Sequence, residues 1–470
     1  MVKNQIITAV VDSLGYNGEG IVHFCGTTVF VPFVLAGEEI TFKVLKVNKN
    51  IAYGKVEAVL KPSKDRVEPV CKVFHKCGGC QLQHMNYETQ LAFKKQMVEN
   101  CFAKIAGLKL SVGKVYASPN KLAYRNKLQL PTRCIKGENR IGFFRENSHD
   151  IISIDSCPIQ PEWAKTVIDC VSRFIEVTGV SLYNDQTKSG LLRHIVVRSE
   201  NNEFLFTVVI NGNVLPKQNK LIEIFSEKFE KFSVIINVNK TDSNVILGKE
   251  FSLVYGSGKI SLNEFNVSYQ IGAESFYQVN TLVKKEIYQD VINSITKSGD
   301  NVVIDAFSGA GVMTAMLAKE CKKCYGVEII KEACQTAEKL AKDNGIDNME
   351  VICGDCEKVL PSLIEELTQK GEKVTLVFDP PRSGVDKKTL QQVLKCNIEN
   401  IVYVSCSPQT LARDIGILVG SLKIENDSII NLCKDFSPNY DIKTLSIYDM
   451  FSQTKHVESV VSLVRRLDNE

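Results

Sequence analysis

Two polar side chains with catalytic chemistry stand just beyond two apolar segments near the carboxyl terminus. The run VTLVF, residues 374–378, ends at Asp379, and IVYV, residues 401–404, is followed closely by Cys406. Short apolar runs that stop at polar or turn-forming residues are typical of buried parallel strands. Because ligands of open α/β sheets bind beyond the carboxyl ends of the strands, we expect both side chains to face one cavity. A thiol beside a carboxylate indicates covalent catalysis.

The elements that must position these side chains follow a strand and helix rhythm. The segment VVIDAFSGAGVMTAMLAKEC predicts a strand, a glycine loop and a helix, and CYGVEII predicts the next strand of a Rossmann-like sheet. Gly309 and Gly311 allow the backbone to approach a nucleoside, and Glu328 can accept hydrogen bonds from ribose hydroxyls. Asp355 and Asp379 follow at later strand ends. Since the loop lacks the third glycine of the dinucleotide fingerprint, this order favours S-adenosylmethionine.

The composition is that of an ordinary globular protein. Of the 470 residues, 44% are hydrophobic and 24% are charged, which suits several buried cores and about three domains at ~150 residues each. The segment MVKNQIITAVVDS shows neither a secretory signal nor a membrane span, so we expect a cytoplasmic protein without membrane association. The 16 cysteines are diluted through a large chain, which indicates buried thiols with a few ligands or nucleophiles. Nothing indicates an obligate protein partner.

Positive charge is concentrated in residues 92–145. This segment carries twelve lysine and arginine residues and two acidic ones, a local charge of +10, whereas the whole chain has +3. Aromatic residues are interleaved with these charges: Phe93, Phe102, Tyr116, Tyr124, Phe143 and Phe144. Aromatic faces among cations suit stacked bases and phosphates, so we expect a nucleic acid partner. The alternative is a solvated basic face without a ligand.

The first 61 residues predict a small β-barrel. Apolar and polar residues alternate between turn signals at Gly15, Gly18, Gly26 and Gly37. The stretch LGYNGEGIV, followed by VFVPFVLAGEEITFKV, resembles the TRAM domain, an OB-like barrel found on RNA-modifying proteins. The alternative is a barrel with a purely structural role.

Three cysteines in the segment CKVFHKCGGCQLQH have the spacing of metal ligands. Cys71, Cys77 and Cys80 are spaced C-x5-C-x2-C, with two glycines that let the backbone fold tightly. A fourth ligand must come from elsewhere, and Cys157 in SIDSCPIQ is the best candidate. Four thiolates suit either zinc or an iron–sulfur cluster, which spacing alone does not separate. His75 and His84 are possible zinc ligands, although single histidines beside cysteines are more often solvent-facing.

Residues 62–270 predict a central α+β domain that carries these cysteines and the basic surface. LLRHIVVRS and EFLFTVVI predict paired strands, and KLIEIFSEKFEKF predicts an amphipathic helix. Arg125 and Arg193 stand at strand starts near the basic segment, so we expect them to contact RNA. Exposed strand arginines without a ligand are the alternative.

The chain resembles a known family over nearly its whole length. It is similar to the bacterial RNA uracil-C5 methyltransferases, in particular to the 23S ribosomal RNA branch with a TRAM domain and a four-cysteine iron–sulfur cluster. The resemblance rests on the barrel, the four cysteines and, in this order, ESFYQVN, DAFSGAG, YGVE, FDPPRSG, VSCSP and KHVESVVSL. It implies an OB-like TRAM barrel at 1–61, a central α+β domain at 62–270 and an α/β Rossmann-like S-adenosylmethionine methyltransferase domain at 271–470.

The resemblance also implies roles for individual residues. The expected cofactor contacts, beside Asp355 from the strand pattern, are Gln278, Phe307, Glu328 and Asp379. Cys406 corresponds to the nucleophile, Glu458 to the base and Phe276 to the aromatic that stacks on the target base. The implied ligands of a [4Fe-4S] cluster are Cys71, Cys77, Cys80 and Cys157. Phenylalanine and serine in DAFSGAG replace the tyrosine and cysteine that related sequences often show, a departure that touches no catalytic role.

Uracil chemistry explains the residue types at the catalytic positions. C5 of uracil is a poor nucleophile until a thiolate adds at C6, and cysteine can both add and leave again. The C5 hydrogen must then be removed before the thiolate departs, and we expect Glu458 to accept that proton. Arg382 and Asp379 are expected to hold the uracil edge and the cofactor, with an ordinary salt bridge as the alternative. A uridine in folded RNA must also flip out of its stack.

Other activities fit the sequence less well. RNA cytosine-C5 methyltransferases carry a DAPCSG-like motif, which places a second cysteine in the strand-end loop. This chain has Arg382 in that loop. Amino-group methyltransferases need an aromatic residue after the prolines and no thiol. A non-catalytic RNA-binding or assembly factor predicts loss of Cys406 or Glu458, and a redox role of the cluster lacks a flavin or nicotinamide signal. The sequence does not choose between 23S ribosomal RNA and transfer RNA, although the resemblance favours the former.

Overall fold

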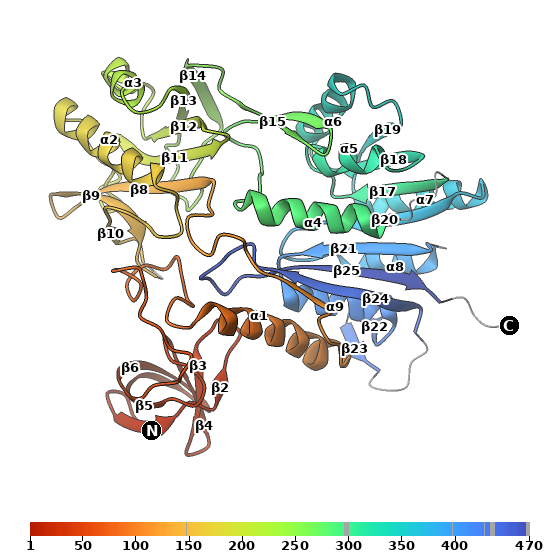
Figure 1. Ribbon diagram of the computed structural model, residues 1–470, viewed down its shortest axis with the longest axis horizontal. Helices are drawn as coiled ribbons and strands as arrows, with labels where there is room; N and C mark the ends of the chain where they lie inside the picture. Colours follow the sequence, from red (N-terminus) through yellow and green to blue (C-terminus); the bar gives the residue numbers. More distant parts are fainter. Residues whose placement is uncertain (147, 296–299, 397, 427, 433–437, 467–470) are drawn as a thin grey trace.

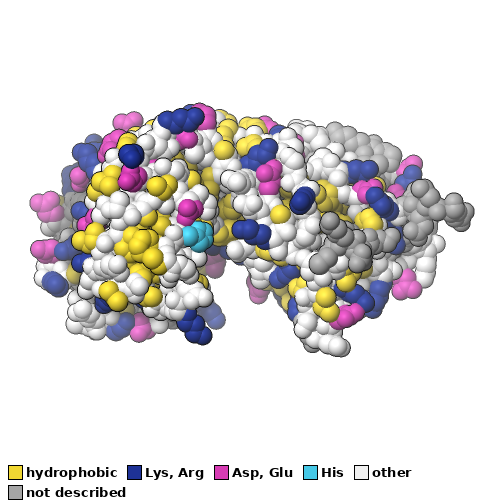
Figure 2. Space-filling model, turned by 90° about the horizontal axis from the view of Figure 1, so that it is seen from below, with side chains coloured by type: hydrophobic (Ala, Val, Ile, Leu, Met, Phe, Trp, Pro, Cys, Tyr) yellow, Lys and Arg dark blue, Asp and Glu magenta, His cyan; other side chains and the backbone are white. Residues whose placement is uncertain are grey.

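A computed structural model describes residues 1–146, 148–295, 300–396, 398–426, 428–432 and 438–466. Along the chain, a small amino-terminal sheet is followed by a central sheet and then by a large sheet flanked by helices (Figure 1). Seen from below, the molecule is hollowed between two lobes, and lysine and arginine side chains lie on both lobes (Figure 2). Within the described ranges, no helix is both long and apolar enough to span a membrane.

The amino-terminal strands form the barrel that the alternating pattern predicts. Their order in the sheet is β1-β5-β6-β4-β3-β2. The bounds are β1 Ile6–Val10, β2 Ser13–Leu14, β3 Gly20–Phe24, β4 Thr27–Val31, β5 Glu39–Asn48 and β6 Ile51–Lys61. Alternate residues of β5 turn inward, so that Ile40, Phe42 and Val44 are buried together.

The central sheet has seven strands in the order β10-β9-β8-β11-β12-β13-β14. They are β8 Lys127–Ile135, β9 Glu138–Phe144, β10 Ile151–Ser153, β11 Leu192–Glu200, β12 Glu203–Ile210, β13 Lys231–Val238 and β14 Glu250–Tyr255. Helices α2 Trp163–Thr178 and α3 Gln218–Ser226 cover one face and bury the stacked rings of Phe206 and Phe225 (Figure 1). A hairpin, β15 Ile260–Glu264 and β16 Val267–Ile271, leads into the next sheet.

The carboxy-terminal sheet has eight strands in the order β19-β18-β17-β20-β21-β25-β24-β7. Its parallel strands are β17 Asn301–Ala306, β18 Lys323–Glu328, β19 Met349–Cys353, β20 Lys373–Phe378 and β21 Asn400–Ser405. The antiparallel strand β25 Glu458–Arg465 pairs with β21 and with β24 Tyr440–Tyr448. A short hairpin, β22 Leu422–Glu425 and β23 Ser428–Asn431, precedes β24. This arrangement confirms the predicted Rossmann-like sheet.

Helices cover both faces of this sheet (Figure 1). Successive residues of the buried strands point to opposite faces, so Ile304 and Leu376 pack in one core whereas Val303 and Val377 pack in the other. The flanking helices are α1 Tyr87–Cys101, α4 Thr281–Ser294, α5 Val312–Ala318, α6 Lys331–Asp343, α7 Cys356–Gln369, α8 Lys387–Lys395 and α9 Pro408–Val419, and the π-helix η1 Phe102–Ala106 follows α1.

Two elements from the segment assigned to the central domain lie against the carboxy-terminal sheet. Helix α1 packs on α9, and strand β7 Lys114–Tyr116 pairs in parallel with β24 at the edge of the sheet. The chain therefore passes from the barrel to the large sheet before it enters the central sheet, and returns to the large sheet afterwards (Figure 1). The elements contributed by residues 87–116 tie the three parts together.

Candidate active site

The register of the large sheet brings Cys406 and Glu458 together. Ser405, the last residue of β21, is paired with Ser459 of the antiparallel strand β25. The next residue on each strand is Cys406 on one side and Glu458 on the other, so the two face each other at the carboxyl edge of the sheet. Glu458 is 4% exposed and Cys406 is half-buried. The sequence did not indicate that Cys406 and Glu458 are neighbours, because their proximity depends on the antiparallel pairing of β25 with β21.

Asp379 and Arg382 lie at the same edge. Phe378 at the end of β20 pairs with Tyr403 of β21, so Asp379 follows one strand away from Cys406. Although solvent reaches the Asp379 side chain, surrounding protein atoms remove much of its hydration, and this desolvation raises its pKa to about 6. Arg382 is exposed.

The electrostatics of the site favour neutral forms of its acids. Burial raises the pKa of Glu458 to about 8, helped by the nearby Asp379 and opposed by Arg382. Burial also raises the pKa of the Cys406 thiol to about 11, and the charge of Glu458 adds to the rise. Arg382 acts in the opposite direction, by its charge and by a hydrogen bond to the thiol. The guanidinium is therefore the group that favours a Cys406 thiolate.

The glycine loop after β17 helps to hold the carboxylate of Glu328, one of the predicted cofactor residues. The backbone N–H of Gly309 donates to Glu328 at 3.0 Å, and the N–H of Ile330 donates to the other oxygen at 2.8 Å. Gly311 has a φ of +76°, and a Cβ there would lie 2.6 Å from Ala337, so only glycine fits. Phe307 also adopts a positive φ, of 67°. These contacts fix the Glu328 carboxylate at the mouth of the loop.

Asp355 has a structural task in addition to its predicted role. Its side chain caps helix α7 and accepts from the N–H of Glu357 at 3.1 Å. Asp305, at the end of β17, is buried and accepts from the Thr314 hydroxyl at 2.6 Å. Burial raises the pKa of Asp305 to about 7.

Segment 272–280 presents the predicted aromatic residue to solvent. Phe276 is 83% exposed, whereas its neighbour Tyr277 is buried. Gln278 is half-buried, and its carbonyl accepts from the Asn126 amide at 3.0 Å. An exposed phenylalanine between anchored neighbours is available to stack on a base.

The basic segment is less uniform than its sequence suggests. Lys94 is buried and donates to Asp449 at 2.5 Å, while Arg133 pairs with Asp185 and Lys114 with Asp290, each at 2.7 Å. Lys94 and Arg133 are therefore buried structural cations, whereas Lys114 is exposed and pairs at the surface. The expected RNA contact of Arg193 was likewise wrong, because this side chain is 3% exposed and donates to the backbone carbonyls of Asn239 and Thr241. Arg125 remains half-buried, and its role stays a prediction.

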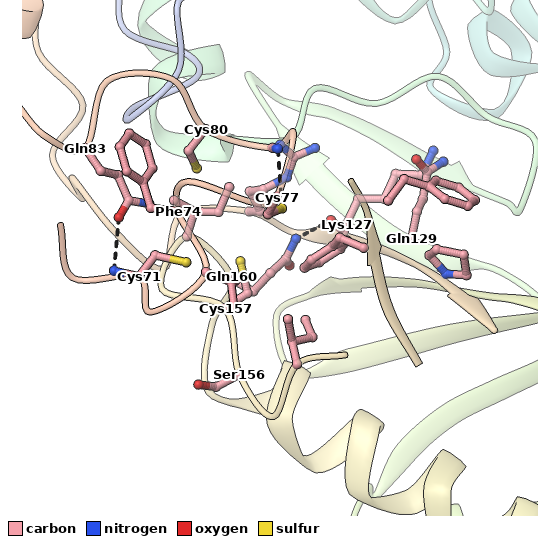
Figure 3. A pocket seen from close by; sticks show the side chains of 18 of the residues that line it. Cys71, Phe74, Cys77, Cys80, Gln83, Lys127, Gln129, Ser156, Cys157 and Gln160 are labelled. Carbon is pink, nitrogen blue, oxygen red and sulfur yellow. Dashed lines mark hydrogen bonds between the residues drawn. The ribbon is translucent and has the colours of Figure 1, made fainter. Parts of the chain in front are cut away.

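The four predicted ligand cysteines line a single cavity of about 300 Å3. Their sulfur atoms lie around the same space, with Cys157 coming from the loop before α2 (Figure 3). Gln83 fixes this segment by accepting from the N–H of Cys71 at 3.2 Å. No three His, Cys, Asp or Glu side chains among the described residues are close enough to hold one metal ion. The donor set matches a thiolate-ligated centre, but the ligand assignment stays a prediction.

The electrostatics of this cavity favour the protonated form of its thiols. Burial raises the pKa of Cys80 to about 12 and that of Cys157 to about 11, and the neighbouring thiols add to both shifts. Arg125 and Lys127 line the same cavity and bring positive charge to it. His84 is fully buried against Phe33 and Phe74, contrary to the expectation that it faces solvent, whereas His75 is exposed as expected.

Sequence reasoning missed two groups at the site. Tyr16, from the barrel, lies close enough to Cys101 and Cys406 for their charges to add to the desolvation that raises its pKa to about 12. Ile329 and Ile330 directly follow Glu328 and are 65% and 57% exposed, which leaves an apolar surface beside the carboxylate. The sequence could have revealed Ile329 and Ile330, because two apolar residues directly after the end of a strand indicate an apolar surface there. The position of Tyr16 depends on docking between distant segments, which the sequence does not encode locally.

A Rossmann-like sheet with a glycine loop, a fixed carboxylate after the second strand and acidic residues at later strand ends defines the class of S-adenosylmethionine-dependent methyltransferases. The family described as tRNA (Uracil-5-)-methyltransferase matches residues 86–466, and the TRAM domain matches residues 3–56. The chain belongs to the tRNA (uracil-5-)-methyltransferase family.

Similar proteins extend over almost the whole chain. A protein named as an uncharacterized RNA methyltransferase of Clostridium tetani is 38% identical and covers 98% of this chain and 96% of its own length. One from Staphylococcus epidermidis is 36% identical, with coverages of 99% and 98%. The solved Pyrococcus abyssi tRNA (uracil-54, C5)-methyltransferase in complex with S-adenosyl-L-homocysteine has 27% identity and a TM-score of 0.75, covering 97% of this chain and 100% of that one.

These similarities confirm several predictions from the sequence. The family resemblance, the fold with its TRAM barrel, and S-adenosylmethionine-dependent methyl transfer with RNA as substrate are confirmed. The particular RNA, the iron–sulfur cluster, the domain boundaries and the roles of individual residues stay predictions.

Proposed function

We propose that this protein methylates C5 of a uridine in RNA and that its target lies in 23S ribosomal RNA. The observation that carries the proposal is the register of β21 and β25, which sets the Cys406 thiol beside the Glu458 carboxyl group at the sheet edge. A nucleophile and a proton acceptor on the same side of a planar ring are what C5 methylation of uracil requires. The cytoplasmic location expected from the sequence belongs to the same proposal.

In the proposed mechanism, Cys406 opens the reaction. Its sulfur bonds to C6 of the uracil, which makes C5 nucleophilic, and the adjacent Arg382 stabilises the thiolate. When bound, S-adenosylmethionine would supply the methyl group that C5 receives and would leave as S-adenosylhomocysteine. Glu458 then takes the hydrogen from C5 as a proton, the C5–C6 double bond re-forms and the sulfur of Cys406 leaves. A pKa of about 8 lets Glu458 both accept and release this proton near neutral pH.

The proposed binding residues surround this chemistry. The cofactor would be held by Gln278, Phe307, Glu328, Asp355 and Asp379, with the backbone-fixed Glu328 carboxylate accepting from the ribose hydroxyls. The exposed ring of Phe276 would stack on the base while the uridine is flipped out of its RNA stack, and Arg382 and Arg125 would contact the RNA. In this scheme residues 1–61 and 62–270 bind RNA, and residues 271–470 carry out methyl transfer.

We also propose that Cys71, Cys77, Cys80 and Cys157 hold a [4Fe-4S] cluster. Support comes from the cavity that the four thiols share and from the family resemblance that their spacing carries. The cluster would stabilise the segment that contacts RNA. Zinc is the competing metal, and measurement of iron and acid-labile sulfide in protein purified without oxygen separates the two.

A transfer RNA target is the second candidate. It is favoured by the likeness to the Pyrococcus abyssi enzyme, whose name gives a tRNA uridine as its substrate. Mapping of 5-methyluridine in ribosomal and transfer RNA, from cells with and without this protein, tests both candidates. Loss of a 5-methyluridine from 23S ribosomal RNA supports the proposal. Loss from transfer RNA alone shows that transfer RNA is the substrate. Unchanged 5-methyluridine in both RNAs contradicts uridine methylation.

A further inference from the structure

Segment 275–280 is held from the central sheet rather than only by its own domain. This segment carries Phe276 and Gln278, which the proposed function assigns to RNA and to the cofactor, respectively. Asn126, directly before β8 of the central sheet, donates from its side-chain amide to the carbonyl of Gln278 at 3.0 Å. Its backbone N–H donates to the carbonyl of Val279 at 2.9 Å. A single buried residue therefore fixes two successive peptide groups of the segment.

A second bridge reaches the same segment from strand β11. Arg198 is 5% exposed, and its guanidinium donates to the carbonyl of Ser275. Asn126 and Ser199 are also joined, because the N–H of Ser199 donates to the Asn126 carbonyl at 2.9 Å. The two bridging residues thus belong to the paired strands β8 and β11 or directly precede them. Arg198 donates to a carbonyl before Phe276, and Asn126 donates to two carbonyls after it.

Further anchors of the segment come from helix α4, the β15–β16 hairpin and the chain after β7. Lys284 of α4 is buried, donates to the Tyr277 hydroxyl at 2.9 Å and pairs with Glu264 of the β15–β16 hairpin. Asn280 donates to the Ser118 hydroxyl at 3.0 Å. Phe276 alone points away from this framework, with 83% of its surface exposed. Movement of β8 and β11 relative to the large sheet must therefore move the Phe276 ring and the Gln278 backbone together.

The bridging strands carry unbalanced positive charge where they meet the segment. Arg125 and Lys127 flank Asn126, and Lys127 lies directly opposite Arg198 in the antiparallel register. Like charges in such a pair repel. In the described part of the chain, none of these three cations forms an ion pair with a carboxylate, and Nε and Nη1 of Arg198 are buried without a partner. Arg125 and Lys127 also line the cavity of the four cysteines. An anion at this place relieves the repulsion, and the phosphodiester groups of the RNA supply such anions.

We propose that Asn126 and Arg198 are positioning residues that couple RNA binding to cofactor binding. RNA phosphates that settle on the partly exposed Arg125 and Lys127 hold the start of β8 in one place, and the bridges of Asn126 and Arg198 transmit that position to Phe276 and Gln278. The inference rests on the proposed function, because it requires that RNA and S-adenosylmethionine bind the same enzyme. By linkage, cofactor binding must tighten RNA binding by the same factor.

The test compares S-adenosylhomocysteine binding with and without RNA. We use the full-length Cys406→Ala protein to prevent turnover, isothermal titration with S-adenosylhomocysteine, and unmodified transcripts of 23S ribosomal RNA domains and transfer RNA as probes. Coupling in proteins is typically about 5–150-fold. We expect RNA to tighten S-adenosylhomocysteine at least about fivefold, and S-adenosylhomocysteine to tighten RNA by an equal factor.

Asn126→Ala is expected to reduce the coupling to less than about twofold while S-adenosylhomocysteine still binds the RNA-free protein. The matched control is Thr281→Val, which removes the hydrogen bonds of the Thr281 hydroxyl with Asn126 and Glu200. It keeps the contacts of Asn126 with Gln278 and Val279 and should retain the coupling. Should Asn126→Ala fail to fold, Arg198→Met removes the bridge to Ser275 and tests the same point. Because the Cys406→Ala parent is measured first, its coupling factor can already decide against the proposal.

The outcomes separate this inference from the proposed function. If the affinity of each ligand is the same with and without the other ligand, the coupling is refuted and the proposed function stands. If Asn126→Ala and Arg198→Met keep the full coupling factor, the bridges are refuted as its route. If the protein binds no RNA transcript or no S-adenosylhomocysteine, the proposed function fails, and the inference fails with it.

Discussion

Replacement of Glu458 by glutamine should trap the enzyme on its RNA. Glutamine keeps the shape and hydrogen-bonding reach of the side chain but cannot take up the C5 proton. Because Cys406 leaves only after that proton has gone, methylated RNA should stay covalently bound through the C6–sulfur bond. The near-complete burial of Glu458 prevents bulk water from replacing it. The Glu458→Gln enzyme should therefore form the adduct at a rate close to normal and resolve it slowly.

The size of the effect follows from the role of a general base. Loss of such a group costs about 10²–10⁴-fold in rate, or roughly 3–5 kcal/mol at ~1.36 kcal/mol per factor of ten. The pH dependence gives a second measure. Only the deprotonated form of Glu458 accepts a proton, and its pKa is raised to about 8. Adduct resolution in the native enzyme should therefore rise about tenfold per pH unit below this value and level off above it.

Adduct formation and resolution must be measured separately. The Cys406 thiol has a pKa of about 11, so adduct formation also accelerates with rising pH, whereas resolution reports Glu458. The assay is denaturing gel electrophoresis of protein mixed with radiolabelled RNA and S-adenosylmethionine, with quenching at successive times. The double variant Glu458→Gln/Cys406→Ala is the control and should form no adduct. Release of methylated RNA by Glu458→Gln at the native rate, with the native pH profile, refutes the assignment of the base.

Three further predictions concern the surroundings of the site. Lys94→Met should destabilise the protein by about 3–5 kcal/mol in denaturant unfolding, because the buried Asp449 carboxylate loses its cation and keeps only the hydroxyl donors Tyr87 and Ser452 among the described contacts. The double change Lys94→Met/Asp449→Leu should recover much of that loss, and an equal loss in the double variant contradicts the explanation. Phe276→Ala should weaken RNA binding by about 1–3 kcal/mol, as expected for a lost stacking contact, without changing S-adenosylhomocysteine affinity; an equal loss for both ligands argues for general disruption. RNA affinity measured by filter binding should fall steeply as salt rises, and a flat response contradicts phosphate contacts.

Local pattern was sufficient to predict the strands that carry the catalytic groups. Apolar runs of β-favouring residues correspond to β20 and β21, whose buried side chains face helices on both sides. The glycine loop was predictable because Gly311 meets a steric requirement that a short sequence motif records. Asp379, Cys406 and Glu328 could thus be placed at one sheet edge before the structure was known.

Contacts between distant segments could not be predicted in the same way. The charge of Lys94 in a basic segment gave no sign of its buried partner Asp449, because the pair joins positions more than 350 residues apart. Strand β7 joins the edge of the large sheet from the middle of that basic segment. Asn126 was one polar residue among charged neighbours, and its bonds to Gln278 and Val279 appear only when two sheets dock.

The most direct test of the proposed chemistry locates the atom that bonds to the RNA. A transcript containing 5-fluorouridine carries no hydrogen at C5 that a base can remove, so it should trap the methylated intermediate on the enzyme. Mass spectrometry of the digested complex should find the nucleotide attached to the peptide at Cys406, and Cys406→Ala should give no complex. Attachment to any other residue, or full methylation of ordinary RNA by Cys406→Ala, would contradict covalent catalysis by this thiol.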